Sequence, residues 1–430
     1  MEELMNKKVF RHYLYFLAGQ QFSMFGSLIV GFTITWWITI ETGSAVFLSL
    51  STFLMFIPQI VVTPIAGVLA DRWSRKIMII ISDSMQALAT FLLFVIFLGG
   101  FQSLWFILAI NTFRAALGAF QLPAVQSLIP TMVPKENLSR INGLNFLMFG
   151  VIFSIGPVIA ALLLSIFTIE QIFLLDIFTF IIALIPLIIV KIPKVNQKTE
   201  ETNVKKSFLN DFKEGFSIIK MVPGLFALIV FAMIWNFIFR PWNVLLPYFV
   251  VYTHNGSALN LAMLLMSFQI ANIIGSLITM IKKDFKHKIK INIIGASLFF
   301  VGQIPAILAP TGNFLVMMIS MFAGALIFPI TVATYMVILQ TVVPKDKIGR
   351  VMSLDHMISM AIAPLGALIS GSLSEVFGIV NLLLICAIIG LIYPSLIWIF
   401  TKIRQLEVLE QNQLNQIRKT VEIEEVAEII

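Results

Sequence analysis

The ten residues 67–76, GVLADRWSRK, place one acid and three bases between two long apolar stretches. VFLSLSTFLMFIPQIVVTPIA (46–66) precedes them and IMIIISDSMQALATFLLFVIFL (77–98) follows. Each stretch is long enough to supply the roughly 20 residues that cross a hydrocarbon layer about 30 Å thick. Charges are costly inside that layer. The ten residues are therefore expected at the membrane–water boundary, as a loop between two transmembrane helices.

The composition extends this pattern to the whole chain. Of its 430 residues, 59% are hydrophobic and 12% are charged, whereas soluble domains carry about 25% charged residues. Apolar runs and loop signals predict an all-α polytopic membrane protein with twelve transmembrane helices. Their predicted limits are 13–40, 45–70, 77–98, 102–128, 140–166, 170–190, 222–251, 257–281, 289–309, 313–339, 350–374 and 378–402.

Lysine and arginine residues predict the orientation of these helices. Of the 29, 27 lie before the first helix, after the twelfth or in every second connection. The alternate connections ETGS, GGFQ, FTIEQ, THNG, APTGN and SEVFG contain none. Basic residues accumulate in cytoplasmic loops. We therefore expect a multi-pass protein of the cytoplasmic membrane with both termini in the cytoplasm. The net charge of +7 then reflects these loops rather than nucleic-acid binding.

Two segments of the chain recur at nearly constant spacing. VPKENLSR at 133–140 returns as VPKDKIGR at 343–350, an offset of 210, and TGSA at 42–45 returns as NGSA at 255–258, an offset of 213. Both pairs fall in equivalent loops of a six-helix unit, which predicts two six-helix parallel repeats. Such repeats are a transporter architecture, with the substrate site near the bilayer midplane where the repeats meet.

The repeat predicts four parts of the chain. They are an N-terminal half (1–190), a linker (191–221), a C-terminal half (222–402) and a tail (403–430). The linker is the longest polar stretch before the tail. Its composition fits either a solvated connection or a short amphipathic helix at the cytoplasmic interface. Apolar residues at loosely helical spacing predict a frayed or accessory helix in the tail.

The charge rule does not explain two residues of the opening loop, Gly67 and Asp71. A glycine lets a neighbouring helix approach closely, and an acid at a helix end can pair with a base or with the N-terminus of a facing helix. The pattern G-x-L-A-D-R-x-S-R-K resembles the signature of this loop in the major facilitator superfamily, with Ser74 where that pattern prefers glycine.

The resemblance covers residues 1–402 through the repeat, the twelve helices and the linker. It implies the major facilitator fold, in which this loop is a latch that faces the start of the eleventh helix, here near Arg350, and favours the outward-open state. We assign Asp355, about a turn into that helix, as a further partner of the loop. The expected latch residues are Gly67, Asp71, Arg72, Arg75, Lys76 and Asp355. The matching loop of the second half, GSLITMIKKDFKHK, lacks the acid, so we expect a one-sided latch.

Charged residues inside the predicted helices are candidate functional groups. Arg114 lies about twelve residues, or roughly 18 Å, into the fourth helix. With Gly118 it resembles the superfamily's signature for that helix, which implies a part in proton coupling. Asp83 and Asp176 are the candidate proton carriers, because burial disfavours the charged form of an acid. Each could equally form a water-accessible structural pair.

In the superfamily, the first, fourth, seventh and tenth helices flank the central pathway. Their polar or aromatic side chains are candidate cavity residues: Gln20, Gln21, Trp36, Asn111, Gln121, Trp235, Asn236, Arg240, Asn243 and Tyr335. Gly156 and Pro157 are expected to bend the fifth helix and to let a neighbour pack closely. The superfamily's exporters share Gly-Pro-x-x-Gly-Gly in this helix, and GPVIAA (156–161) keeps only the Gly-Pro.

WW (36–37), TGSA and GVLADRWSRK together resemble the bacterial macrolide-efflux branch of the superfamily, which also contains siderophore exporters. The resemblance implies a monomeric antiporter that exports hydrophobic or amphipathic compounds in exchange for protons by alternating access. Its partners would be the small substrate, protons and the lipid bilayer. The alternatives on the same fold are a siderophore-like exporter, a lysophospholipid flippase and a nutrient importer. A sensing receptor without transport is a further alternative.

An enzyme or an ATP-driven pump fits the sequence poorly. The phosphate-binding pattern G-x-x-x-x-G-K-[ST] is missing, and the four histidines, at 12, 254, 287 and 356, are scattered rather than spaced as metal ligands. The single cysteine, Cys386, lies in an apolar stretch. We therefore expect no catalytic residue, no metal site and no cofactor.

Overall fold

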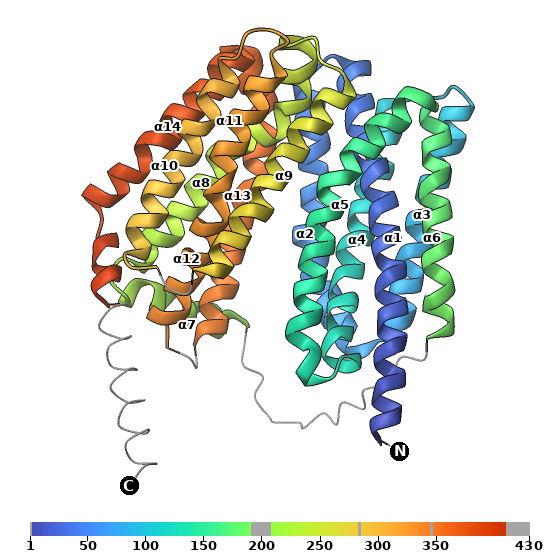
Figure 1. Ribbon diagram of the computed structural model, residues 1–430, viewed down its shortest axis with the longest axis horizontal. Coiled ribbons are helices and arrows are strands. Elements are labelled where there is room, and N and C mark those ends of the chain that lie inside the picture. Colours follow the sequence, from blue (N-terminus) through green and yellow to red (C-terminus); the bar gives the residue numbers. More distant parts are fainter. Residues whose placement is uncertain (1, 191–207, 283–284, 345–346, 410–430) are drawn as a thin grey trace. The chain divides into compact units, whose positions relative to one another are not determined.

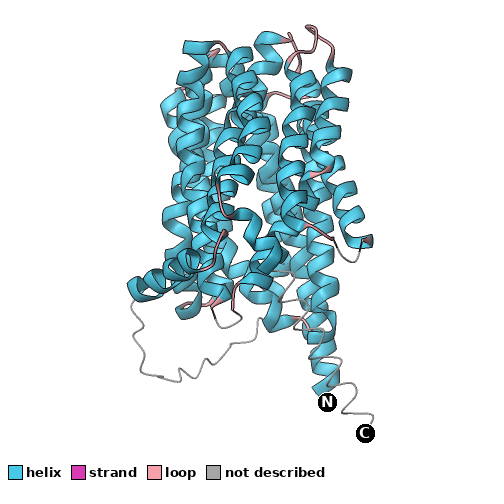
Figure 2. Ribbon diagram, turned by 90° about the vertical axis from the view of Figure 1, so that its left-hand side faces the viewer, coloured by secondary structure: helices cyan, strands magenta, loops and turns pink. Residues whose placement is uncertain are grey.

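A computed structural model describes residues 2–190, 208–282, 285–344 and 347–409. Throughout these residues the regular elements are helices (Figure 2). In the first half they are α1 (Glu2–Thr42), α2 (Ala45–Arg72), α3 (Arg75–Leu98), α4 (Leu104–Met132), η1 (Lys135–Asn137), α5 (Leu138–Ile166) and α6 (Ile169–Ile189). The later helices are α7 (Phe208–Met221), α8 (Leu225–Tyr248), η2 (Phe249–Thr253), α9 (Ala258–Ile281), α10 (Lys288–Ile307), α11 (Phe314–Leu326), α12 (Phe328–Val342), α13 (Ile348–Phe377) and α14 (Ile379–Phe400).

Within these described ranges, twelve helical spans are long and apolar enough to cross a membrane, which confirms the predicted number. The tenth span, Phe314–Val342, is divided between α11 and α12 at Ile327. Pro329 lies in the first turn of α12, a position that tolerates proline because the first turn has no internal partner for its missing N–H. The short helix α7 is not among the twelve spans, and it corresponds to the amphipathic alternative for the linker.

The described residues form two compact units. The first contains the described parts of Met1–Glu200, Val244–Gln269 and Ala367–Glu375, and the second contains those of Glu201–Asn243, Ile270–Gly366 and Val376–Ile430. The first unit therefore consists mainly of α1 to α6 (Figure 1). The predicted four-part division of the chain follows the sequence duplication, and it stays a prediction.

Two apolar clusters hold the first unit together. One contains Phe16 of α1, Met78 of α3 and Leu128 of α4. The other contains Ile34 of α1 and Leu93 of α3. The length of α3 between Met78 and Leu93 joins the two clusters. Polar side chains of α3 between these two residues are therefore positioned by a helix that is packed into an apolar cluster at each end.

Parts of the second half of the sequence also pack inside the first unit. The Tyr252 hydroxyl donates to the carbonyl oxygens of Thr39 at 3.2 Å and Ile40 at 3.3 Å, both at the end of α1. Gly371 of α13 lies against the start of α2, where an added Cβ would be 2.6 Å from the carbonyl oxygen of Ala45. Only a residue without a side chain permits this approach of two helix backbones.

The second unit is built around aromatic rings. Trp235 of α8 lies 5.2 Å from Phe299 of α10 and 5.1 Å from Phe328 of α12, measured between ring centroids. Glycines bring the neighbouring helices close: an added Cβ at Gly302 would lie 2.4 Å from the Cα of Gly324. Helix α7 joins this unit through Glu214, which accepts from Arg350 at 2.8 Å and pairs with Lys347 at 3.5 Å.

Candidate functional site

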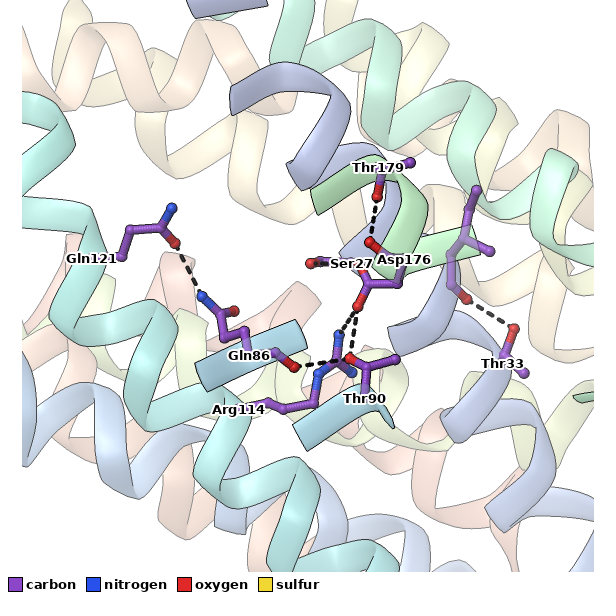
Figure 3. A network of polar contacts seen from close by, with 9 residues as sticks. Ser27, Thr33, Gln86, Thr90, Arg114, Gln121, Asp176 and Thr179 are labelled. Atoms are coloured by element: carbon purple, nitrogen blue, oxygen red, sulfur yellow. Dashed lines mark hydrogen bonds and ion pairs between the residues drawn. The ribbon is translucent and has the colours of Figure 1, made fainter. Parts of the chain in front are cut away.

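A buried ion pair joins α4 to α6. The Nη2 atom of Arg114 donates to Oδ2 of Asp176 at 2.9 Å, and the two side chains are 7% and 5% exposed. Thr90 of α3 donates to the same oxygen at 2.8 Å, and Ser27 of α1 donates to Oδ1 at 3.1 Å (Figure 3). The Asp176 carboxylate thus accepts from three other helices, which compensates its burial.

A second buried carboxylate, Asp83, has a different environment. The Nε2 atoms of Gln20 and Gln121 donate to its two oxygens at 3.1 and 2.5 Å. Among the residues that the structure describes, no basic side chain forms an ion pair with Asp83. The two acids and Arg114 together therefore carry one net negative charge when all three are ionised.

A chain of polar contacts connects the two carboxylates. Gln86 donates from Nε2 to Oε1 of Gln121 at 3.2 Å, and the Thr90 hydroxyl, whose single hydrogen can go to Asp176 or to the Gln86 carbonyl, lies 3.0 Å from that carbonyl oxygen. Since Gln121 reaches Asp83 and Thr90 reaches Asp176, these polar groups run from one acid to the other along α3. Figure 3 shows the part from Gln121 to Asp176. The contact between the Gln86 and Gln121 side chains can be remade when a neighbouring group gains or loses a proton, because an amide both donates and accepts, whereas the Gln86 carbonyl oxygen only accepts from Thr90.

This network borders a cavity of about 270 Å³ in the first unit. Both carboxylates line it, together with Gln20, Gln21, Ser23, Ser27, Gln86, Gly118 and Gln121, and apolar side chains such as Phe180 complete the wall. The cavity therefore combines apolar surface with convergent polar groups, as small-molecule sites do.

Two glycines explain how the helices approach so closely here. An added Cβ at Gly26 of α1 would lie 2.0 Å from Oγ1 of Thr179 and 3.0 Å from Oδ1 of Asp176, so any side chain there would collide with α6. At Gly118 of α4 an added Cβ would meet only Oε1 of Gln86, at 3.8 Å. Gly26 therefore permits helix contact, whereas Gly118 leaves space in the cavity.

The structure brings together some of the predicted residues and separates others. Gln20, Gln21, Asp83, Gln121 and Asp176 line one cavity, and Arg114 is bonded to it through Asp176. Trp36 and Asn111 also belong to the first unit but do not line that cavity. Asn111 is buried three residues before Arg114, and Trp36 is half-buried.

The remaining cavity predictions fall in the second unit. Trp235 is part of the aromatic cluster, and Asn236 donates to the Ala232 carbonyl of its own helix at 3.0 Å. Arg240 packs against Gly366 of α13, where an added Cβ would lie 3.1 Å from the Cβ of Arg240. Asn243 is exposed. The Tyr335 hydroxyl donates to the buried Asp355 carboxylate. A role of these five residues in substrate binding stays a prediction.

The predicted latch is described only in part. The side chains of Asp71 and Arg72 lie outside the described residues. Arg75 donates to the Ser127 carbonyl at 2.9 Å and to the Thr131 hydroxyl at 3.0 Å, and so fastens the start of α3 to α4. Lys76 donates to two carbonyls at the end of α6. Among the described residues of the first unit, nothing lies within 4 Å of an added Cβ at Gly67, so no helix of that unit makes the expected close approach there.

The bend predicted at Gly156 and Pro157 lies within α5, which is one helix from Leu138 to Ile166. An added Cβ at Gly156 would lie 2.2 Å from Cδ2 of Leu28, so this glycine does let α5 approach α1 closely. Four residues of the site, Gly26, Ser27, Gln86 and Thr90, were not predicted from the sequence. Helical spacing was the available signal for two of them, since positions 83, 86 and 90 lie on one face of α3.

Comparison with known proteins decides the family. A family model described as Major Facilitator Superfamily matches residues 16–361 and, in a second alignment, 243–423. The chain belongs to the major facilitator superfamily. It is similar to Macrolide efflux protein A of Streptococcus pyogenes, with 28% identity over 364 residues that cover 84% of this chain and 89% of the relative. The protein of the same name in Enterococcus faecalis is 29% identical over 327 residues, which cover 75% and 99% of the two chains.

The fold comparison agrees with this assignment. A bacterial homologue of the iron transporter ferroportin, solved in an inward-facing state, superimposes with a TM-score of 0.69 at 14% identity, covering 90% of this chain and 98% of that one. The superfamily member described here is thus a multi-pass membrane transporter and not an enzyme, as the sequence predicted.

Proposed function

We propose that this transporter exports hydrophobic or amphipathic compounds of the macrolide type in exchange for protons. The observation that carries the proposal is the cavity of the first unit, which two buried carboxylates line, while one base, Arg114, pairs with them among the described residues. The substrate class rests on the relatives named Macrolide efflux protein A. We further propose that it acts as a monomer in the cell membrane with both termini in the cytoplasm.

In this proposal Asp83 is the residue that binds and releases the proton. Protonation of Asp176 would leave the buried Arg114 guanidinium without its counter-charge, which is strongly unfavourable. Protonation of Asp83 leaves no such charge, because its partners Gln20 and Gln121 are neutral amides. Asp176 then acts as the fixed partner of Arg114, and the Gln121–Gln86–Thr90 contacts relay a change at Asp83 toward that pair.

Exchange follows from the single net negative charge of the cavity. Either a proton on Asp83 or a cationic group of the exported compound can balance it, and a low-polarity site favours one compensating charge rather than two. Release of the compound then favours proton uptake, and proton release favours binding of the next compound. The loop 67–76 is proposed to control alternation between the two access states, with Asp71 as the latch residue.

Expression of the chain in a macrolide-sensitive, efflux-deficient host tests this proposal. We expect the intact chain to lower macrolide accumulation and an uncoupler of the proton gradient to abolish the effect. Asp83→Asn should lose nearly all export at equal expression, because the amide cannot bind and release a proton. Glu41→Gln is the matched control, since Glu41 is an exposed acid at the end of α1. Equal export by Asp83→Asn and the intact chain would refute the proton carrier.

A pair of glycine variants tests whether the cavity itself is the pathway. Gly118→Leu adds a side chain at a residue that lines the cavity, where an added Cβ meets only Oε1 of Gln86 at 3.8 Å, whereas Gly143→Leu adds one at an exposed position where nothing lies within 4 Å of an added Cβ. We expect Gly118→Leu to block macrolide export and Gly143→Leu to retain it. If a siderophore, a lysophospholipid or a nutrient were moved instead, the same two variants would separate for that substrate and not for macrolides.

A further inference from the structure

A second cavity of the first unit lies between α1 and α6 and measures about 550 Å³. It is formed by residues between Arg11 and Phe22 of α1 and between Ile182 and Val190 of α6, and α1 packs along α6. It shares no lining residue with the acidic cavity. The proposed transport reaction therefore does not account for it. We call it the α1–α6 groove.

Small residues on α1 give the groove its depth. Ala18 and Gly19 lie between Tyr15 and Phe22 on one helical face, because positions three and four apart are stacked along a helix. Gly19 brings the two helices together: an added Cβ would lie 2.8 Å from Cγ of Pro186. Tyr15 is 56% exposed and Phe22 is 55% exposed, so they form the raised ends of a trough whose floor is Ala18 and Gly19.

The long wall of the groove is apolar. Ile182, Ile185 and Ile189 line it from α6, and all three are exposed large hydrophobic residues. They lie within the membrane-crossing span Ile169–Ile189. Hydrocarbon is the solvent at this depth. An extended acyl chain is therefore the natural occupant of the apolar part of the trough.

One end of the groove is basic. Arg11 and His12 line it from α1. Lys76 approaches it from α3: its ammonium donates to the carbonyl oxygens of Ile188 at 2.7 Å and Val190 at 2.8 Å, and Val190 itself lines the groove. These carbonyls use two of the three ammonium N–H groups. No acid is among the described residues that line the groove.

The basic end lies near the start of a candidate membrane span. Arg11 is close to the start of the membrane-crossing span Val9–Thr42. From there to Phe22 the groove follows α1 for about 16 Å at 1.5 Å per residue. A cationic site at the boundary that continues as an apolar trough into the membrane matches the charge and the shape of an anionic phospholipid.

We infer that the α1–α6 groove binds one anionic phospholipid, with its phosphate at Arg11, His12 and Lys76 and one acyl chain over Ala18 and Gly19. Basic pockets between transmembrane helices bind anionic head groups. The groove differs from a general lipid contact because a basic end, with Arg11 and His12 of α1 and Lys76 of α3 beside it, continues directly into an apolar trough. This site is independent of the proposed export reaction.

Native mass spectrometry of the full chain in detergent tests the inference, with phosphatidylglycerol and phosphatidylcholine as the lipids added. We expect the intact chain to retain one phosphatidylglycerol in preference to phosphatidylcholine. Arg11→Ala should weaken phosphatidylglycerol binding about fivefold, the effect of one basic group near a membrane surface. Ala18→Phe should abolish the preferred binding, because the new ring fills the trough.

Two control variants decide whether the groove or the general charge is responsible. Arg140→Ala removes an exposed base of α5 in the same unit, and Ala109→Phe adds a ring at an exposed alanine of α4. Both should bind phosphatidylglycerol as the intact chain does. Equal retention of the two lipids by the intact chain, or equal losses in Arg11→Ala and Arg140→Ala, would overturn the inference. Circular dichroism of each variant confirms that the helices are retained.

Discussion

The two halves of this chain use equivalent helices for different chemistry. Helices α3 and α10 begin at Arg75 and Lys288, the same offset of 213 that relates TGSA to NGSA. In this register Asp83 corresponds to Ala296, and Gln86 corresponds to Phe299. Helix α3 therefore carries part of the polar network, whereas α10 carries part of the aromatic cluster.

The same contrast extends to the other helices of the network. At the later offset of 210, Gly118 of α4 corresponds to Phe328 of α12, and Asp176 of α6 corresponds to Cys386 of α14. A ring thus occupies the second half where a glycine leaves space in the first. The comparison indicates that the duplicated helices provide a common scaffold. At these corresponding positions the first half holds a buried charge and a polar network, and the second half packs aromatic rings.

The largest expected effect comes from breaking the ion pair. Arg114→Leu leaves Asp176 buried without a counter-charge, and we expect the free energy of unfolding to fall by about 4 kcal/mol. Denaturant titration in detergent micelles measures it. The double variant Arg114→Leu/Asp176→Leu makes the first half resemble the second, and it should recover stability to within about 1 kcal/mol, since apolar replacements of a buried pair are often neutral. If the double variant did not recover its stability, the ion pair itself would be required to stabilise the fold.

The second effect tests the aromatic cluster. Trp235→Ala removes a ring that contacts Phe239, Phe299 and Phe328, and we expect a loss of about 3 kcal/mol because the cavity cannot fully collapse. Trp105→Ala is the control: Trp105 is largely exposed and makes an edge contact with Phe47 at 5.9 Å between ring centroids. Equal losses in the two variants would contradict a packed core at Trp235.

A smaller effect is expected at the one described carboxylate–tyrosine contact of α12 and α13. Tyr335→Phe removes the hydroxyl that donates to Asp355, and we expect a loss of about 2 kcal/mol, as for a hydrogen bond to a buried charged group. Tyr252→Phe, whose hydroxyl donates to backbone carbonyls at a half-exposed position, should lose less than half of this. Thermal unfolding of both variants decides the order.

The smallest effect concerns α7. Glu214 pairs with Arg350 and Lys347, but its side chain is 43% exposed. Exposed ion pairs contribute little, so Glu214→Gln should lower the free energy of unfolding by about 0.5 kcal/mol. This difference should disappear at high salt, which screens the ion pair. A loss above that of Tyr335→Phe would mean that α7 is fastened to α13 mainly by this charge rather than by the close approach of Gly215 to Leu354.

The sequence was sufficient for the fold because membrane spans are long and apolar. Twelve spans, the family and the charged position of Arg114 could all be predicted without coordinates. The partner of Arg114 could not, since Asp176 is 62 residues away and only packing brings the two together. Gly26 could not be selected either, because its role depends on the position of Thr179 across a helix interface.

The residues of the acidic cavity could be predicted from the sequence only in part. Gln20 and Gln121 were predicted as polar residues of helices that flank the pathway in the superfamily, and Asp83 was predicted as a charged residue inside an apolar helix. Gln86 and Thr90 were not, although they share a helical face with Asp83. Their importance lies in the tertiary contacts that connect one carboxylate to the other, and helical spacing alone does not show which face meets another polar helix.

Proton movement in proteoliposomes tests the central claim most directly, that Asp83 exchanges a proton for the exported compound. With a pH-sensitive dye and an imposed proton gradient, addition of a macrolide should drive proton flux through the intact chain and through Glu41→Gln. The same addition to Asp83→Asn, matched for protein and orientation, should produce no flux. Macrolide-dependent proton flux through Asp83→Asn at the rate of the intact chain would contradict the account.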